Sequence, residues 1–178
     1  KFNKLIISKI QEIDSNFNLK INDVTVKLNL FSFAINAKTL GTDLIFRNKL
    51  VELENIKSKI SLKSLINNQF ALSEIMISTK SIPIKDLISL LRMMKNDPKL
   101  LIAEQFIDDG YIVADLKFEF DEAGKINKNY KINGFVNNFQ VSFLKKKISK
   151  LNLIFQVTEK EINFNDVSLL FNNKSMDI

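Results

Sequence analysis

Residues 112–120 read IVADLKFEF, and this stretch decides the fold class of the chain. Apolar side chains occupy its even positions, and Asp115, Lys117 and Glu119 occupy most of the odd ones. Because successive side chains of a strand point to opposite faces of a sheet, this period of two predicts a strand with one apolar face. The turn DEAGK at 121–125 follows, and Gly124 suits the positive φ of a type I turn with a bulge. The sequence therefore predicts a β-hairpin here.

Alternation of the same kind continues on both sides of this hairpin. It predicts strands at 24–30, 44–46, 50–53, 56–62 and 72–77 before it, and at 130–136, 139–143, 151–157 and 162–164 after it. After Leu30 the run through Phe31, Phe33 and Ile35 continues as strand in the opposite phase, as at a bulge or tight turn. Strand patterning then extends to Phe171, and we expect no charged closing strand after it.

The first 15 residues have helical spacing. Phe2, Ile6, Ile10 and Ile13 recur at intervals of three or four, which predicts an N-terminal helix over 1–15. Two interpretations remain open for it. The helix packs on the end of the sheet, or it is the tail of a segment that descends from a membrane anchor.

A second helical region separates two β regions. Apolar residues from Leu87 to Met94 recur at helical intervals, and Asp97-Pro98 reads as an N-cap and the first residue of another helix. The chain thus divides into a first β region at 16–85, a two-helix insert at 86–108 and an antiparallel meander at 109–178. The insert is a connection between the two β regions or, alternatively, a lid.

Composition points away from catalysis. The 178 residues contain no histidine and no cysteine, which removes the commonest general base, thiol nucleophiles and the usual zinc ligands. The paired carboxylates at 108–109 and 121–122 lack the ligand spacing of a calcium loop. No glycine-rich phosphate loop or nucleophile elbow occurs. We expect a protein that is not an enzyme and has neither metal nor cofactor.

The net charge of +6 comes mostly from dispersed lysines, since Arg47 and Arg92 are the only arginines. Proteins that read nucleic acids cluster their basic residues and favour arginine, so we expect no nucleic-acid partner. The one basic cluster is Lys145, Lys146 and Lys147. It is either a solvated strand end or a contact for anionic lipid head groups.

Fifteen phenylalanines against two tyrosines favour rings without a polar atom. Such rings suit a dry interior or contact with lipid. The apolar faces either pack against helices or a second sheet, or stay uncovered and bind a ligand. The second interpretation gains from the absence of predicted helices after residue 108. The residues expected to line this apolar face are Ile112, Ala114, Leu116, Phe118, Phe120, Ile132, Val136, Val141, Phe143, Leu151, Leu153, Phe155, Val157, Ile162 and Phe164.

The ends of the chain suggest a piece of a longer protein. It begins at Lys1 and ends at Ile178 within a strand-like pattern. No apolar run approaches the ~18 residues that span a bilayer. We therefore expect 1–178 to be a single fragment whose membrane anchor lies outside it.

Residues 51–92 carry a family resemblance. A strand runs into Ser61–Ile66 (SLKSLI), a polar turn NNQ follows at 67–69, and a strand LSEIMI follows at 72–77. This order resembles the AsmA-like family, including its YhdP and TamB branches. The upstream stretch 24–46 and the meander after Tyr111 are similar to the same repeating strands, whereas the two-helix insert departs from them.

The resemblance implies a mainly β fold with a few helices, in which a long, curved antiparallel sheet forms an open apolar groove. It implies anchoring on the periplasmic side of the inner membrane of a Gram-negative-type cell. The implied function is non-enzymatic transfer of phospholipid or another lipid between inner and outer membranes, with protein partners in the cell envelope. The alternative is a scaffold that assists outer-membrane protein assembly through exposed strand edges. A soluble nucleic-acid or polyanion binder is a third, less favoured class.

Overall fold

The computed structural model describes residues 17–46, 49–67, 69, 71–94, 98–143 and 146–177. The helix expected over 1–15 lies outside the described residues, as do Asp97 and Lys145. Within the described residues, strands far outnumber helices. In chain order the elements are β1 (Phe17–Asn29), β2 (Ala34–Phe46), β3 (Lys49–Ser61), α2 (Leu62–Ile66), β4 (Leu72–Thr79), β5 (Ile82–Pro83), α3 (Ile84–Met94), α4 (Pro98–Phe106), β6 (Ile107–Glu119), β7 (Lys131–Phe143), β8 (Lys146–Thr158), β9 (Ile162–Phe171) and β10 (Lys174–Asp177).

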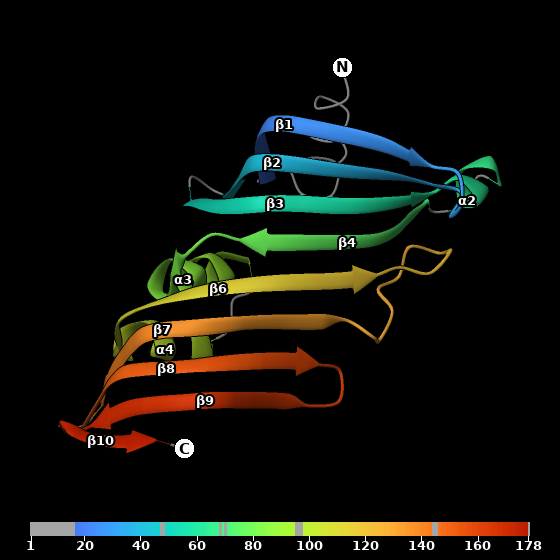
Figure 1. Ribbon diagram of the computed structural model, residues 1–178. Coiled ribbons are helices and arrows are strands. Elements are labelled where there is room, and N and C mark those ends of the chain that lie inside the picture. The colour runs from blue at the N-terminus through green and yellow to red at the C-terminus, as the bar shows by residue number, and fades with distance from the viewer. Residues whose placement is uncertain are drawn as a thin grey trace. The chain divides into compact units, whose positions relative to one another are not determined.

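The strands form one open antiparallel sheet with the order β1-β2-β3-β4-β6-β7-β8-β9-β10 (Figure 1). The short strand β5 pairs with β6 beside this path. Almost every strand neighbours the strand that precedes it in sequence, as short connections favour. A mainly β fold with a few helices and an open antiparallel sheet is thereby confirmed.

The chain divides into two compact units. Unit 1 takes the described residues of Lys1–Lys80, with Asp115–Ile132 and Thr158–Lys160. Unit 2 takes those of Ser81–Ala114, Asn133–Val157 and Glu161–Ile178.

In unit 1, β1 and β2 form a hairpin with an uninterrupted register from Phe17↔Phe46 to Asn29↔Ala34. The turn is closed by the Asn29 side chain, whose Oδ1 accepts a hydrogen bond from the Ser32 backbone N–H at 3.1 Å. Phe33 completes the turn with φ 47°. The expectation that Phe31 and Phe33 continue a strand is therefore wrong, because both lie in the turn between β1 and β2.

Two pairs of expected strands are each a single strand. The runs at 50–53 and 56–62 both belong to β3, which gives way to α2 at Leu62. The runs at 130–136 and 139–143 both belong to β7, which begins at Lys131. Each expected division falls where the apolar alternation changes phase within a continuous strand.

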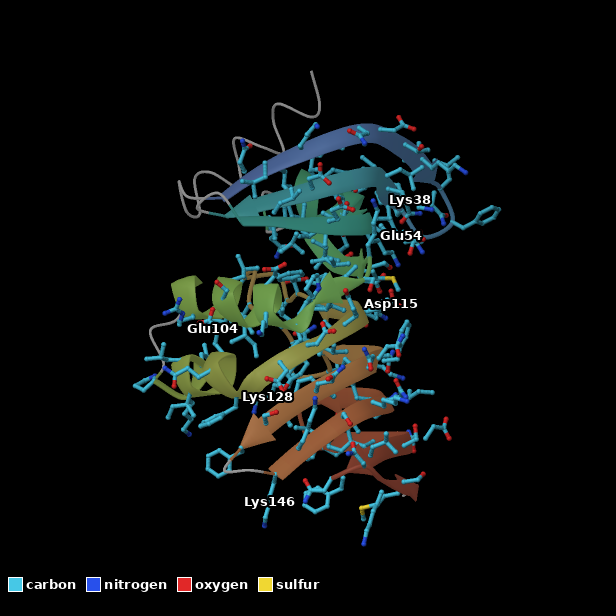
Figure 2. All side chains as sticks on the ribbon, turned by 90° about the vertical axis from the view of Figure 1, so that its left-hand side faces the viewer. Lys38, Glu54, Glu104, Asp115, Lys128 and Lys146 are labelled. Carbon is cyan, nitrogen blue, oxygen red and sulfur yellow. The ribbon has the colours of Figure 1, made fainter. Side chains whose placement is uncertain are left out.

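In unit 2, α3 and α4 lie together on one side of the strands (Figure 2). Pro98 opens α4, as its fixed φ favours at a first helical position. The Arg92 guanidinium Nε lies 3.0 Å from Glu104 Oε2 and joins the two helices. Ile84, Ser89 and Leu90 of α3 are buried, so this helix supplies part of the core of unit 2.

The end of the sheet differs from the expectation. The short strand β10 pairs with β9 from Lys174↔Phe171 to Asp177↔Ser168. Lys174 and Asp177 make it a charged closing strand, and the expectation that none follows Phe171 is wrong. A short charged edge strand is one way in which sheets avoid further pairing.

Candidate functional site

A phase break crosses the first three strands of unit 1. The apolar positions of β2 change there from odd numbers to even numbers, on either side of Gly41. Gly41 has φ 57°, and it is skipped in the pairing with Asn22 of β1 and Glu54 of β3. The same change of phase occurs in β1 and β3 beside these partners. We call Asn22, Gly41 and Glu54 the unit 1 break.

Two threonines show what the break does to the faces of the sheet. Thr39 and Thr42 stand on either side of Gly41, and the Thr42 hydroxyl donates to Thr39 Oγ1 at 2.7 Å. In an uninterrupted strand, residues three apart point to opposite faces. Their contact therefore places both on one face, where Thr42 is fully buried. The break lets one face stay apolar although the alternation shifts by a residue.

Unit 2 contains a corresponding break. Asn138, Lys150 and Asp166 have φ 50°, 51° and 52° and interrupt β7, β8 and β9. In β7 and β9 the apolar positions pass from even to odd numbers at these residues, and in β8 they also change phase at Lys150. The Asn138 backbone N–H donates to Asn152 Oδ1 at 2.9 Å, which ties β7 to β8 at this level. We call Asn138, Lys150 and Asp166 the unit 2 break.

On one side of the unit 2 break, aromatic rings gather on one face. A Cβ built on Gly134 would lie 2.7 Å from Phe155 Cζ, so the Phe155 ring covers the backbone of β7 at that glycine. Phe155 pairs with Phe164 of β9, and Val157 pairs with Ile162. Phe155 exposes only 9% of its surface, whereas Ile162 and Phe164 each expose 60%. We call the surface of Gly134, Phe155, Val157, Ile162 and Phe164 the phenylalanine face.

On the other side of the break, the helices reach the strands. Phe106 at the end of α4 meets Phe143 of β7 edge to face, with ring centroids 4.7 Å apart. Gly110 approaches both Phe139 and the Ile84 side chain of α3. Phe143, expected to line an open face, thus contacts a helix, although half of its surface remains exposed. Within unit 2, a helix therefore covers part of this face at Phe143.

The opposite face of unit 2 is not wholly polar. Gln156 Nε2 donates to Asn133 Oδ1 at 2.9 Å across this face. Phe135 and Ile154 point the same way, and each exposes 47%.

The residues expected to line an apolar face lie in four strands. Ile112, Ala114, Leu116 and Phe118 alternate along β6, and Phe120 follows it in an isolated bridge with Ile126. In unit 1, Leu116 pairs with Ile77 and Phe118 with Ile75. The remaining expected residues are Ile132, Val136, Val141 and Phe143 in β7, Leu151, Leu153, Phe155 and Val157 in β8, and Ile162 and Phe164 in β9.

The basic cluster is brought to the start of β8. Lys146 and Lys147 are exposed there, and the Lys147 backbone N–H donates to Asn172 Oδ1 at 2.9 Å. Lys145 lies outside the described residues.

A second charged group lies on the face of unit 1 opposite the apolar residues. Lys117 Nζ is 2.9 Å from Glu119 Oε1 and 3.1 Å from Glu74 Oε2. Its hydrogen bonds to Glu119 and Glu74 raise the pKa of Lys117. Hydrogen bonds from Lys117 and Asn129 lower the pKa of Glu119. Lys117 and Glu119 therefore both keep their charges across the neutral range.

The described residues hold no cluster of three or more acidic, histidine or cysteine side chains arranged to bind a metal ion. None of their helices is long and apolar enough to cross a bilayer.

Sequence reasoning missed the residues of the two breaks. Gly41, Asn138, Lys150 and Asp166 are polar or glycine residues inside apolar strands, where they resemble strand ends. The sequence did contain a signal: the apolar positions change once between odd and even residue numbers in each of these strands.

Comparison with known proteins gave no relative. No protein-family model, no curated protein and no solved structure matches this chain.

Proposed function

We propose that this protein is a non-enzymatic lipid-binding module in which the sheet forms an open apolar groove that shields acyl chains. In this proposal it belongs to a longer, membrane-anchored protein on the periplasmic side of an inner membrane. There it transfers phospholipid or another lipid between two membranes. The proposal draws on the resemblance of residues 51–92 to AsmA-like proteins and on the phenylalanine face.

The exposure of Ile162 and Phe164 carries the proposal. Each exposes 60% of its surface. Their cross-strand partners, Val157 and Phe155, lie on the same face, so the exposed side chains stand in an apolar group. Exposed apolar side chains that stand together mark binding surfaces more often than isolated ones do. Phenyl rings offer no polar atom, so the ligand that fits them is apolar.

The energetics of lipid exchange explain why such a face is useful. Moving an acyl chain of ~16 carbons into water costs ~0.8 kcal/mol per methylene, of the order of 10 kcal/mol in total. A face that stays in contact with the chain offsets much of this cost. Strands of 13 residues, such as β7 and β8, extend about 40 Å, which exceeds the length of one acyl chain.

The test is lipid binding by a pair of matched variants. Phe164→Asp places a carboxylate on the phenylalanine face, and Phe135→Asp places one on the opposite face at a similarly exposed position. A charge in a dry apolar contact costs several kcal/mol, so Phe164→Asp should lose most lipid. Phe135→Asp should retain it. Native mass spectrometry of the gently purified protein and dye-labelled lipid transfer between liposomes would measure both.

Circular dichroism serves as the folding control for both variants. Absence of lipid from the wild-type protein, or equal transfer by the two variants, would contradict the proposal.

A strand-edge scaffold is the second candidate, and one observation favours it. β10 pairs with β9 only at Ser168–Phe171. Along Ile162–Val167, no described residue pairs with the outer edge of β9. An unpaired edge can template an incoming strand, as assistance to outer-membrane protein assembly requires.

A further inference from the structure

A hollow of about 430 Å³ lies on unit 1, over strands β1 to β4. Its lining includes Lys27, Lys38, Lys57, Lys59, Glu74 and Met76. We call it the lysine hollow. Lys38 alternates with the buried residues Ala37 and Thr39, so the hollow lies on the charged face and not on the apolar one. Figure 2 shows Lys38 projecting from β2 on the same side as Asp115 of β6.

The register brings the lysines together from three strands. Lys38 of β2 stands directly opposite Lys57 of β3. Asn36 stands between Lys27 of β1 and Lys59 of β3, as partner of both. Like charges directly opposite each other in a sheet are destabilising. The fold therefore bears a cost at this place that an anion in the hollow would remove.

The protein supplies little negative charge of its own to the hollow. Glu74 is the one carboxylate among the lining residues, and its Oε2 is already 3.1 Å from Lys117 Nζ outside the lining. None of the four lysines forms an ion pair with a described residue. The four lysines and Glu74 together give the lining a net charge of +3.

The remaining lining limits the kind of anion. The side chains of Thr25 and Asn36 add neutral hydrogen-bonding groups, and Met76 and Leu40 add apolar surface. A volume of about 430 Å³ falls in the range of small-molecule sites and exceeds what a single inorganic ion fills. Lysine ammonium groups bind phosphate oxygens as point charges.

We propose that the lysine hollow binds a phosphate group carried on a small organic body. This site lies on the face opposite the apolar residues, so it goes beyond the lipid-holding function. The phosphate belongs either to the head group of an anionic phospholipid or to a soluble organic phosphate, since both present the same oxygens.

The test compares two double variants of the full chain that lose the same charge. Lys38→Gln with Lys57→Gln removes the opposed pair in the hollow. Lys63→Gln with Lys131→Gln removes two exposed lysines elsewhere in unit 1. At low salt, titration calorimetry with glycerol 3-phosphate and pyrophosphate gives the soluble arm. Flotation with phosphatidylcholine vesicles, with and without phosphatidic acid, gives the lipid arm.

We expect the hollow variant to weaken binding about tenfold or more in one arm, and the control variant to weaken it less than about twofold. Loss confined to phosphatidic acid vesicles would identify a lipid head group, and loss in the calorimeter a soluble phosphate. An equal loss in both variants, or no saturable binding in either arm, would overturn the proposal. Unchanged circular dichroism of the hollow variant would show that the loss is not unfolding. If it unfolds, the single Lys38→Gln variant replaces it.

Discussion

The Thr39 side chain accepts a backbone hydrogen bond from the neighbouring strand, as a backbone carbonyl usually does in a sheet. Its Oγ1 accepts the Ile56 backbone N–H at 3.1 Å and the Thr42 hydroxyl at 2.7 Å. Thr39 and Thr42 are both buried, so neither group can turn to water instead. Because an unsatisfied buried donor costs more than a made bond gains, this threonine matters more than its size suggests.

The two threonines should differ in their effect on stability. Thr42→Val removes one hydroxyl donor and should lower the free energy of unfolding by about 1 kcal/mol. Thr39→Val leaves both the Ile56 N–H and the Thr42 hydroxyl without an acceptor, so it should cost roughly 2 to 3 kcal/mol. Urea unfolding followed by circular dichroism would measure both. Equal losses would show that Thr39 Oγ1 does not hold the break together.

At the scale of elements, the strands are long because their breaks do not end them. β7, β8 and β9 each continue through a residue in the left-handed region. A left-handed residue costs a side-chain-bearing amino acid about 1 kcal/mol, so these positions are held by the packing on both sides.

At the unit 2 break, a residue that normally favours strands should lower the stability of the protein. Asp166→Val introduces a residue with high strand propensity, yet its branched Cβ is incompatible with φ 52°. We expect it to lower the free energy of unfolding by about 1 to 2 kcal/mol. Asn165→Val, at the exposed neighbouring position, should be neutral within about 0.5 kcal/mol. Thermal unfolding of the two variants would measure the difference, and a stabilised Asp166→Val variant would contradict the assignment.

The alternation of residues such as those at 112–120 was enough to predict a mainly β chain and an antiparallel meander. The helical spacing of Leu87 to Met94, with Pro98 after it, was enough to predict the two helices of the insert. It was not enough to predict strand lengths. Asn138 and Glu54 interrupt apolar runs, and a polar residue there is as typical of a turn as of a break. The lysine hollow could not be predicted from the sequence either, because the register of three strands is needed to place Lys27, Lys38 and Lys57 near one another.

At the scale of the whole molecule, the sheet is open and its two outer strands differ. β1 is 13 residues long and, among the strands of the described residues, pairs with β2 alone. At the other end, β10 covers β9 for four residues only. Open edges bring a risk of pairing between copies, which charged residues on the edge reduce.

We expect the isolated chain to associate through the outer edge of β9. Adding charge to that edge with Asn163→Lys and Asn165→Lys should lower association, because facing edges would then repel each other. Sedimentation velocity over a range of concentrations would measure it. The same two lysines placed at Asn133 and Asn137 of β7, a strand inside the sheet, form the control. A wild-type chain that stays monomeric at all concentrations would rule out this edge as a docking site, and with it the scaffold function.

The unit 1 break also restricts how strands can slide past one another. A pattern with period two distinguishes the faces of a strand, but it cannot distinguish a correct pairing from one displaced by two residues. Gly41 is matched by Asn22 and Glu54 on its neighbours, so a displacement of two residues would set a kinked position against regular backbone on both sides. The mismatch penalises a slip that hydrophobicity alone would tolerate. Strands that share the same period of two thereby gain a single alignment, and errors of alignment during folding become correctable.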